Sequence, residues 1–334
     1  MKLASFETIT DVQLIEGADR IELARVQGWQ SVIRKGEYKV GDRVIFVPID
    51  TVLEPREWNK FLQDKNDPSK PIRVRTVKLR NTISQGLIFP ISIVGEAFCW
   101  AASDEEDLPH VLGITKYEKP IPANLQGQVV GDFPTHLISK TDEDNLKSNI
   151  AALEELKSAD YVQVNIKCDG SSASYIKELD GTFRVCSRNL ELKYSEDNAF
   201  WQAANKYSIR EAMPLGTCIQ AELCGPGIQS NPMGLKELTL YVFNVKDLVT
   251  GAYRNIAPCY GIESVPFLRT YNREQFAGET IDSLQALANS IKYPNGKPAE
   301  GIVLRGITRD NQLMFSKTLQ KMLSVKIINQ NYKD

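Results

Sequence analysis

Short segments of alternating polarity, separated by turn residues, fill the first hundred residues and limit most strongly what this chain can fold into. Each segment is typical of a β-strand, because apolar and polar residues alternate or β-branched residues predominate. The intervals between them are too short for crossover helices. A small antiparallel barrel is therefore predicted, an OB-fold as first choice and an SH3-like barrel as the alternative. The predicted strands are Leu3–Ile9, Ile21–Val26, Gln30–Arg34, Arg43–Ile49, Arg73–Leu79 and Ile83–Pro90.

The length and composition of the chain exclude several classes of protein. At roughly 100–200 residues per domain, 334 residues correspond to about two domains. A hydrophobic content of 42% excludes disorder, and no apolar run approaches the roughly 18–20 residues of a membrane span. The N-terminus lacks a secretion signal, and the six cysteines form no CxxC pair. We expect a reduced compartment, cytoplasmic or nuclear, with no secretion and no membrane association.

Charge and histidine content restrict the chemistry further. The net charge is −2, so any binding of nucleic acid must use a local basic patch. The chain has only two histidines, His110 and His136, which leaves almost no material for a histidine-rich zinc site or a Ser-His-Asp triad. Catalysis, if present, must use lysine and carboxylates.

The second half of the chain mixes predicted strands with a few helices and shows no βαβ rhythm. This pattern predicts an α+β fold with mainly antiparallel sheets. Leu179-Asp180-Gly181 is typical of a hairpin turn, because glycine accepts a positive φ. The helices are predicted at Leu146–Lys157, Asp197–Met213 and Ile281–Ile291; the strands are Tyr161–Ile166, Ser172–Lys177, Thr182–Ser187, Thr217–Leu223, Leu238–Lys246, Gly301–Ile307 and Leu323–Ile328.

Lys167 begins the motif Lys167-Cys168-Asp169-Gly170, where one predicted strand ends and a hairpin begins. A lysine there can project from a sheet edge into a cleft. Its amine is a nucleophile only when neutral, so burial or a nearby cation must lower its pKa from the ordinary value of about 10.4. Alone, the motif is weak and more typical of a surface turn in which Asp-Gly reverses the chain.

Five further segments follow Lys167 in a particular order, and each taken alone fits an ordinary surface or core residue. Together with KCDG, the segments SRN, AELCG, YVFNV, AEGIVLR and SVKI resemble the nucleotidyltransferase motifs of ATP-dependent ligases and mRNA capping enzymes. The chain is most similar to the Deinococcus/Naegleria-type RNA ligases, including its opening EGADRIELARVQGWQ and the segments VRTVKLRNTISQGL, LGITKYEKPIPANL and KTDEDN. The resemblance extends over nearly the whole chain.

This resemblance implies an α+β architecture with an N-terminal all-β OB barrel in residues 1–105. A linker, residues 106–140, would wrap onto an adenylyltransferase domain of antiparallel sheets flanked by helices in residues 141–334. The implied enzyme is an ATP-dependent RNA ligase that joins 5′-phosphate and 3′-hydroxyl ends through a lysyl-AMP and an adenylylated polynucleotide. Its partners would be RNA ends or a nicked duplex with ribonucleotides on the 3′-hydroxyl side, and a monomer is expected.

The acidic run Asp104–Asp107 is predicted to be a solvated loop.

The resemblance also implies catalytic roles. Lys167 would accept AMP, and Lys326 would help to lower the pKa of its amine. Asp169 would orient the lysine or the waters of a metal ion. Glu222 and Glu300 would hold Mg²⁺ or Mn²⁺ through waters. Because Ser324 stands where many relatives have a second lysine, Lys317 or Lys321 could supply that cation.

Other residues would bind the nucleotide and the polynucleotide. Arg188 is expected to contact the ribose or a phosphate, and Ser172 a phosphate end. Phe243 would stack on one face of adenine while the pair Ile302 and Val303 covers the other.

The segment Lys70–Arg80 carries five cations and no acid. Arg73 and Arg75 are predicted to share a strand face, with Lys78 and Arg80 on the other parity after a bulge near Thr76-Val77. With Trp29, Phe46 or Trp58 nearby, this strand could follow a phosphate backbone. The alternative is a solvated edge strand protected by its charge.

Two other functions remain open from the sequence. One is a capping-type guanylyltransferase, which would form a covalent adduct with GTP rather than ATP. The other is a non-catalytic OB-fold RNA-binding protein, which would form no covalent nucleotide at all.

Overall fold

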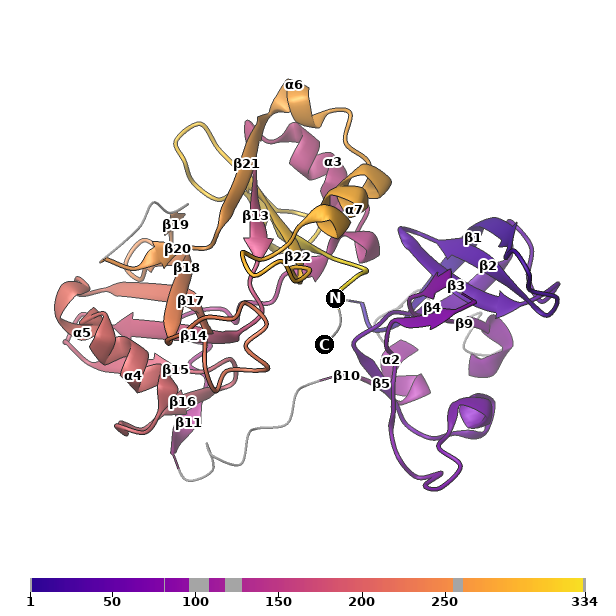
Figure 1. Cartoon of the computed structure of the whole chain (residues 1–334), viewed down its shortest axis with the longest axis horizontal. Helices are drawn as coiled ribbons and strands as arrows, with labels where there is room; N and C mark the ends of the chain where they lie inside the picture. Colours follow the sequence, from indigo (N-terminus) through magenta and orange to yellow (C-terminus); the bar gives the residue numbers. More distant parts are fainter. Residues whose placement is uncertain (1, 81, 96–107, 118–127, 255–260, 333–334) are drawn as a thin grey trace. The chain divides into compact units, whose positions relative to one another are not determined.

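A computed structural model describes all residues except 1, 81, 96–107, 118–127, 255–260 and 333–334 (Figure 1). The chain divides into two compact units, Met1–Pro120 and Ile121–Asp334, which are described separately. The division falls inside the segment predicted as a linker. The predicted end of the barrel at residue 105 and the acidic run Asp104–Asp107 lie outside the described residues.

The main sheet of the first unit is five-stranded and antiparallel, in the order β3-β2-β1-β4-β9. β1 pairs with β4 through its first half and with β2 through its second, and its register shifts between Ile9 and Asp11. Such a bulge increases strand twist and lets a sheet curl towards a barrel. The strands are β1 (Ser5–Leu14), β2 (Ile21–Val26), β3 (Trp29–Arg34), β4 (Arg43–Val47) and β9 (Leu87–Pro90).

Two smaller sheets complete this unit, in the orders β10-β5-β6 and β7-β8. The pairing of β10 with β5 makes Ile114–Lys116, within the predicted linker, part of the first unit. The strands are β5 (Thr51–Leu53), β6 (Ile72–Arg73), β7 (Val77–Leu79), β8 (Thr82–Ser84) and β10 (Ile114–Lys116); the helices are α2 (Leu108–Leu112) and 3-10 turns at Glu57–Leu62 and Ile91–Val94.

The aromatic residues of the barrel pack its interior. Trp29 and Phe46 are each 2% exposed, and their ring centroids lie 6.1 Å apart. Trp58 is half-buried with its ring edge-on to Phe89. Trp29 and Phe46, named as possible neighbours of the basic segment, therefore lie in the core and are not exposed beside it, because the alternation of their strands turns them inwards.

The second unit contains two large sheets. The first has the order β11-β16-β15-β14-β17-β18-β19, with β20 also paired to β18; the second has the order β12-β25-β22-β13-β21. The first sheet consists of β11 (Val129–Asp132), β14 (Ser171–Lys177), β15 (Phe183–Cys186), β16 (Leu190–Leu192), β17 (Thr217–Cys224), β18 (Thr239–Asp247), β19 (Tyr253–Arg254) and β20 (Glu263–Ser264). The second consists of β12 (Asp144–Asn145), β13 (Tyr161–Lys167), β21 (Phe267–Asn272), β22 (Gly301–Ile307) and β25 (Ser324–Ile328), and a separate pair is formed by β23 (Phe315–Ser316) and β24 (Lys321–Met322).

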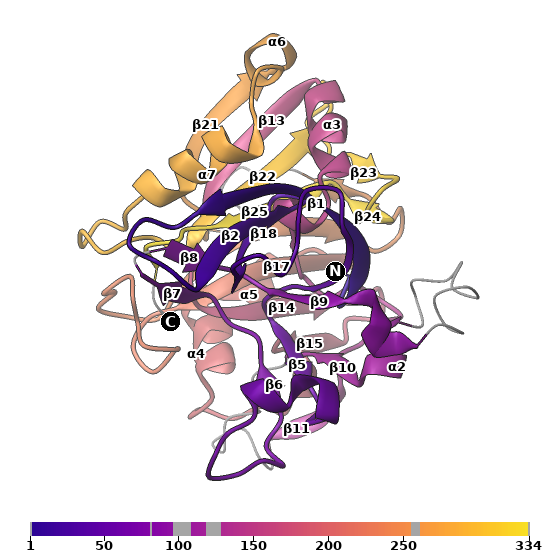
Figure 2. The same cartoon turned by 90° about the vertical axis from the view of Figure 1, so that its right-hand side faces the viewer.

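Helices cover one face of each large sheet (Figure 1, Figure 2). On the five-stranded sheet, α3 (Ala151–Ser158), α6 (Arg273–Phe276) and α7 (Ile281–Ser290) pack on the apolar side chains of β13, β22 and β25. On the other sheet, α4 (Ala199–Lys206) and α5 (Ile209–Ala212) pack on β14, β15 and β17. The opposite faces of these sheets remain available for polar side chains.

The predicted helices form with local differences. Ile281–Ile291 becomes α7, whereas Asp197–Met213 is divided at Ser208, whose φ is +47°. Leu146–Lys157 is divided into a 3-10 turn, Leu146–Ser148, and α3. None of the helices in the described parts of the chain combines the length and the apolar character that a membrane span requires.

Candidate active site

Lys167 is the last residue of β13, and strand alternation sets the direction of its side chain. Val162 and Val164 are fully buried against the helices, so Asn165 and Lys167 point to the opposite face, which we call the site face. Across the register, Lys167 pairs with Gly301 and Asn165 with Val303. The prediction that Lys167 stands at a strand end before a hairpin is confirmed.

Two glycines allow close backbone contacts beside this lysine, each with a neighbouring strand of its own sheet. A Cβ on Gly170 would collide with the Leu223 carbonyl and lie 2.7 Å from Cys224 Sγ. Gly301 has a φ of +156°, and a Cβ there would collide with the Ile327 carbonyl. Because only glycine fits these positions, the chain can cross from β13 to β14 immediately after Lys167.

Glu300 and Glu222 provide the negative charge around Lys167. Lys167 Nζ lies 2.8 Å from Glu300 Oε2, and the two side chains are only 20% and 19% exposed. Glu300 directly precedes β22, and Glu222 projects from β17 of the other sheet. Residues more than 50 positions apart in the sequence therefore meet at one buried amine.

The pKa of Lys167 departs from the sequence-based expectation. Burial alone would lower it, but Glu300 and then Glu222 reverse the effect and raise the pKa of Lys167 above its ordinary value. The direction is therefore opposite to the expected lowering by burial and Lys326. Burial raises the pKa of Glu222 to about 8, against the opposing effect of Lys167. Burial also raises the pKa of Glu300 despite its ion pair.

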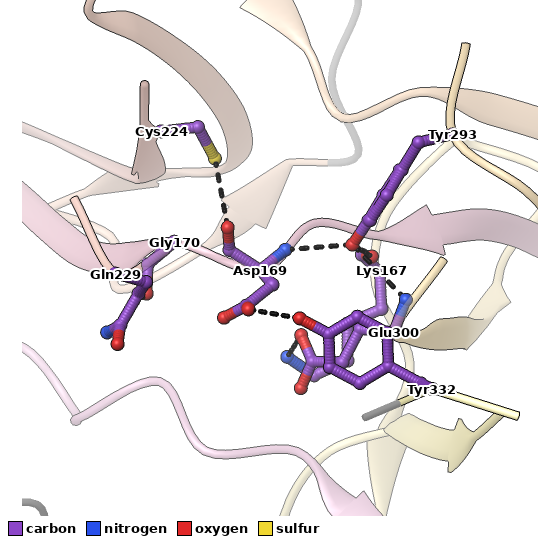
Figure 3. A network of polar contacts seen from close by, with 8 residues as sticks. All are labelled: Lys167, Asp169, Gly170, Cys224, Gln229, Tyr293, Glu300 and Tyr332. Atoms are coloured by element: carbon purple, nitrogen blue, oxygen red, sulfur yellow. Dashed lines mark hydrogen bonds and ion pairs between the residues drawn. The ribbon is translucent and has the colours of Figure 1, made fainter. Parts of the chain in front are cut away.

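A network of hydrogen bonds surrounds the Lys167–Gly170 turn (Figure 3). Tyr332 donates its hydroxyl proton to Asp169 Oδ2. Tyr293 donates to the Lys167 carbonyl over 2.9 Å and accepts from the amides of Asp169 and Glu300 over 3.1 and 3.2 Å. Both the backbone and the carboxylate of Asp169 are thereby held in place.

Phe243 and Val303 are two of the residues predicted to cover the faces of the base. Phe243 is the extra residue of a bulge: Gln220 pairs with Asn244 while Ala221 pairs with Val242. Val303 lies on the site face, but Ile302 points the opposite way and is fully buried in the helix-covered core. The prediction that both residues cover the base is therefore wrong for Ile302, because neighbouring strand residues face opposite sides.

A cavity of about 410 Å³ opens beside Phe243. Arg305 lies two residues after Val303, is 4% exposed, and donates from Nη1 to the Phe243 carbonyl over 2.6 Å. Among the described residues that line this cavity, three have a buried polar atom with no hydrogen-bond partner: Asn165 Oδ1, Ser264 Oγ and Arg305 Nε. Unpartnered buried polar groups are rare, so these three residues are the unsatisfied polar part of the cavity wall.

Three predicted cations take different positions. Lys326 lies on β25 opposite Val303, on the site face, and lowers the pKa of Glu300. Lys321 forms a salt bridge with Asp144 instead, with Nζ 3.2 Å from Asp144 Oδ2. Lys317 is exposed in the turn between β23 and β24. Of the three, only Lys326 has a recorded electrostatic effect on a site carboxylate.

Ser172 and Arg188 lie further along the eight-stranded sheet. Ser172 pairs across the strands with Glu222, so both side chains share a face, and its hydroxyl is 2.8 Å from that of Thr141. Arg188 is exposed and pairs with Asp142 at 3.3 Å. These residues border the site without touching Lys167 in the recorded contacts.

The basic segment of the first unit differs from its predicted form. Arg73 ends the two-residue β6, Arg75 lies outside any strand, and Lys78 is in β7. Arg73 Nη2 is 3.4 Å from Asp50 Oδ1, and its guanidinium lies 3.5 Å from the ring centroid of Tyr117. The predicted shared strand face of Arg73 and Arg75 is therefore wrong, whereas Arg75, Lys78 and Arg80 are exposed.

The sequence analysis missed four residues of the site. Two of them could have been found: Asn165 and Arg305 follow from counting two residues along a strand from Lys167 and from Val303. Tyr293 and Tyr332 carry no local signal, because they reach the site from segments outside any predicted element.

The combination of an OB unit with a buried lysine and carboxylates between two antiparallel sheets defines a polynucleotide ligase. Comparison with known families supports this class: residues 3–91 match an OB-fold domain, and residues 160–321 match the RNA ligase family. Naegleria gruberi RNA ligase with PPi is 30% identical over 98% of this chain and 97% of that chain, with a TM-score of 0.82. This chain belongs to the RNA ligase family.

Two further solved structures are equally similar. A mutant of Naegleria gruberi RNA ligase with ATP and Mn is 29% identical over 99% of this chain and 98% of that chain, with a TM-score of 0.82. Another mutant with AMP and Mn is 29% identical over 98% and 97%, also with a TM-score of 0.82. No curated protein matches the chain.

Proposed function

We propose that this RNA ligase uses ATP to join 5′-phosphate and 3′-hydroxyl ends through a lysyl-AMP on Lys167. The observation that carries the proposal is the buried amine of Lys167, whose Nζ lies 2.8 Å from Glu300 Oε2. Lys167 directly precedes a turn that contains Gly170, where a side chain would not fit. The similar Naegleria enzyme has been solved with ATP and Mn, with PPi, and with AMP and Mn. ATP is the substrate, and PPi and AMP the two released products, of the reaction proposed here.

In the first step, the neutral Lys167 amine attacks the α-phosphorus of ATP. A nitrogen–phosphorus bond forms, the bond to the bridging oxygen of the β-phosphate breaks, and pyrophosphate leaves with the electron pair. Attack requires the unprotonated amine, so the proton shared in the Lys167–Glu300 ion pair must pass to a base first, and Glu300 Oε2, 2.8 Å from Nζ, is placed to accept it. The in-line geometry and the neutralisation of charge supply most of the rate enhancement.

In the second step, an oxygen of the RNA 5′-phosphate attacks the AMP phosphorus. The nitrogen–phosphorus bond breaks, Lys167 recovers a proton, and a 5′–5′ pyrophosphate linkage forms. In the third step, the 3′-hydroxyl oxygen attacks the phosphorus of the RNA end and releases AMP. Asp169, held by Tyr332, would orient the reacting groups, and Lys326 would neutralise charge on the phosphates.

Glu222 and Glu300 fit a hydrated divalent cation. Within the described ranges, no group of three or more His, Cys, Asp or Glu could enclose a metal directly. Two carboxylates and a set of waters match the preference of Mg²⁺, and of Mn²⁺ as its substitute. When bound, this cation supplies positive charge that neutralises the α-phosphate.

The base of ATP fits the space between Phe243 and Val303. Asn165 faces the site two residues before Lys167, about 6.6 Å along the strand, which is comparable to the span from an α-phosphate to its base. Asn165, Ser264 and Arg305, which line the cavity beside Phe243, would supply donors and acceptors to the edge of a base. Arg188 would contact the ribose or a phosphate.

We propose nicked RNA-containing duplexes with ribonucleotides on the 3′-hydroxyl side as substrates. Ser172 would contact a phosphate end near Glu222, and the exposed cations Arg75, Lys78 and Arg80 would contact the RNA backbone. A monomer in a reducing compartment, cytoplasmic or nuclear, fits the proposal. The four cysteines within the described part of the chain are free thiols: Cys168, Cys186, Cys218 and Cys224.

The test uses the complete protein with α-labelled ATP or α-labelled GTP, followed by denaturing gels. We expect an acid-labile covalent adduct with ATP, no adduct with GTP, and none in Lys167→Ala. Nicked duplexes with ribose or deoxyribose at the 3′-hydroxyl end should then be sealed only, or much faster, with ribose. A covalent adduct with GTP alone would instead indicate a capping-type guanylyltransferase.

A further inference from the structure

Tyr293 occupies a fixed position behind the Lys167 turn. It follows α7 in a tight turn, in which its amide donates to the Lys297 carbonyl and its carbonyl accepts from the Gly296 amide, both over 2.9 Å. The residue is 3% exposed, and its ring packs in a cluster with Cys168, Cys224 and Ala299. Backbone and ring are thus both restrained, so the hydroxyl has little freedom to move.

The hydroxyl of Tyr293 uses its full hydrogen-bonding capacity on main-chain groups. A phenolic hydroxyl has one proton to donate and two lone pairs to accept with. The proton goes to the Lys167 carbonyl over 2.9 Å, and the lone pairs accept from the amides of Asp169 over 3.1 Å and Glu300 over 3.2 Å (Figure 3). No bond goes to a side chain, so the hydroxyl acts as a clamp on the backbone.

The three clamped groups belong to the two segments whose side chains meet at the reaction centre. Lys167 and Asp169 lie at the end of β13, whereas Glu300 lies 133 positions later, before β22. The hydroxyl therefore links the backbone of the nucleophile directly to the backbone of its carboxylate partner. A small displacement of either backbone would change the 2.8 Å contact between Nζ and Oε2.

We propose that Tyr293 is a positioning residue for the first nucleotidyl transfer, acting through the backbones of Lys167, Asp169 and Glu300. This inference rests on the proposed function. The hydroxyl of Tyr293 bonds to main-chain groups and not to the reacting amine, and Tyr293 is not among the residues that line the cavity beside Phe243. Loss of its hydroxyl should consequently reduce the rate of the chemical step while leaving the affinity for ATP nearly unchanged.

The test compares Tyr293→Phe with a matched control, Tyr175→Phe. Tyr175 is also fully buried, and its hydroxyl donates to the Phe200 carbonyl over 3.1 Å in the core below α4, away from Lys167. Both variants keep the ring and lose a buried hydroxyl. Formation of covalent AMP would be followed in single turnovers over a range of ATP concentrations, at a temperature where both variants remain folded.

We expect Tyr293→Phe to lower the rate constant at saturating ATP by about tenfold to a hundredfold, as misplaced reacting groups typically do. The half-saturating ATP concentration should change less than about twofold. Tyr175→Phe should lower the unfolding temperature but keep the wild-type rate constant. A wild-type rate constant in Tyr293→Phe, or a loss confined to ATP affinity, would overturn the inference.

Two further outcomes are distinguishable. If wild type and Tyr175→Phe also form no covalent AMP, the proposed function fails rather than this inference. If Tyr293→Phe does not fold, 3-fluorotyrosine introduced at position 293 alone keeps the hydroxyl while weakening it as an acceptor. That substitution should lower the saturated rate constant by a smaller factor, and an unchanged rate constant would contradict the positioning role.

Discussion

At the scale of single residues, the central feature is a lysine stored as a charged group between carboxylates. Burial penalises the charged amine, but Glu300 at 2.8 Å and Glu222 outweigh that penalty and raise the pKa of Lys167. These contacts therefore favour the protonated amine, which is not a nucleophile. We infer that binding of the nucleotide and a cation must separate the lysine from Glu300 before attack.

The role of Glu222 gives the first residue-scale prediction. Glu222→Ala should reduce the rate of AMP transfer to Lys167 by about a hundredfold, because it removes a carboxylate that would hold the cation neutralising the α-phosphate. The variant should also need a higher Mg²⁺ or Mn²⁺ concentration for half-maximal rate. Metal titrations of single-turnover adenylylation measure both effects. Glu154→Ala, at an exposed position of α3, serves as the control, and an equal loss there would exclude a specific role.

The site residues were predictable from the sequence to the extent that they sit on recognisable strand ends. Lys167, Glu222, Glu300 and Lys326 lie in or beside strands whose positions were predicted closely, and the structure brings the lysine and both glutamates together. Their charge balance was not predictable. It depends on a distance between side chains that local sequence does not encode.

At the scale of elements, strand alternation explains one wrong prediction. The bounds of β22, Gly301–Ile307, agree with the sequence, yet Ile302 and Val303 were assigned to the same surface. In the structure Ile302 belongs to the core with Val164 and Leu304, and Val303 faces the site. The position of Phe243 depends on a bulge in β18, which arises from pairing with β17 and has no marker within YVFNV.

These two neighbours should respond differently to truncation. Ile302→Ala should lower the free energy of unfolding by about 2–5 kcal/mol, because it leaves a cavity in the core. Val303→Ala should have a smaller effect on stability and weaken ATP binding about fivefold, or about 1 kcal/mol, by removing one side of the base stack. Denaturant unfolding measures the stability of each variant, and equilibrium binding measures its affinity for ATP. A larger stability loss in Val303→Ala together with weaker ATP binding in Ile302→Ala would contradict the observed strand orientation.

The contact between α3 and the β23–β24 turn predicts a pH dependence of stability. Glu155 Oε1 accepts from the Thr318 amide over 2.8 Å and from its hydroxyl over 2.6 Å. Burial works against ionisation, but hydrogen bonds from Ser316 and Thr318 outweigh it and lower the pKa of Glu155 below 4.5. A lowered folded-state pKa stabilises the protein above pH 4.5, and this stabilisation disappears as the pH falls through the folded-state value.

Glu155→Ala should therefore lower the free energy of unfolding at pH 7 by about 1 kcal/mol, a modest value because the contact is solvent-exposed. The difference from wild type should shrink as the pH is lowered from 5 towards 3. Urea unfolding at several pH values measures this trend. A difference that is constant with pH would show that the ionised carboxylate contributes nothing to the contact.

At the scale of the whole molecule, the order of the two units was predictable, and the division falls inside the predicted linker, but its exact position was not predictable. Alternating segments without crossover helices indicated the barrel, and the motif order indicated the ligase domain. The boundary depends on the pairing of Ile114–Lys116 with β5, about sixty residues earlier, which no local pattern reveals. The contacts of Arg73 were not predictable either, because its partners Asp50 and Tyr117 are more than twenty residues away from it in the sequence.

The exposed cations of the first unit give a prediction for RNA binding. The triple variant Arg75→Ala, Lys78→Ala and Arg80→Ala should weaken binding of nicked duplex and lower the slope of log affinity against log salt by about 2. Covalent AMP formation without RNA should be unchanged, because these side chains belong to the unit that lacks Lys167. Binding assays across a salt series measure the slope, and an unchanged slope would identify this segment as a solvated edge.

The identity of the acceptor amine tests the whole account most directly. After incubation of the full chain with ATP and Mn²⁺, digestion and mass spectrometry should locate one acid-labile AMP on the peptide that carries Lys167, and Lys167→Ala should carry none. AMP on Lys326 or any other lysine, or AMP that persists in Lys167→Ala, would contradict the assignment of the nucleophile.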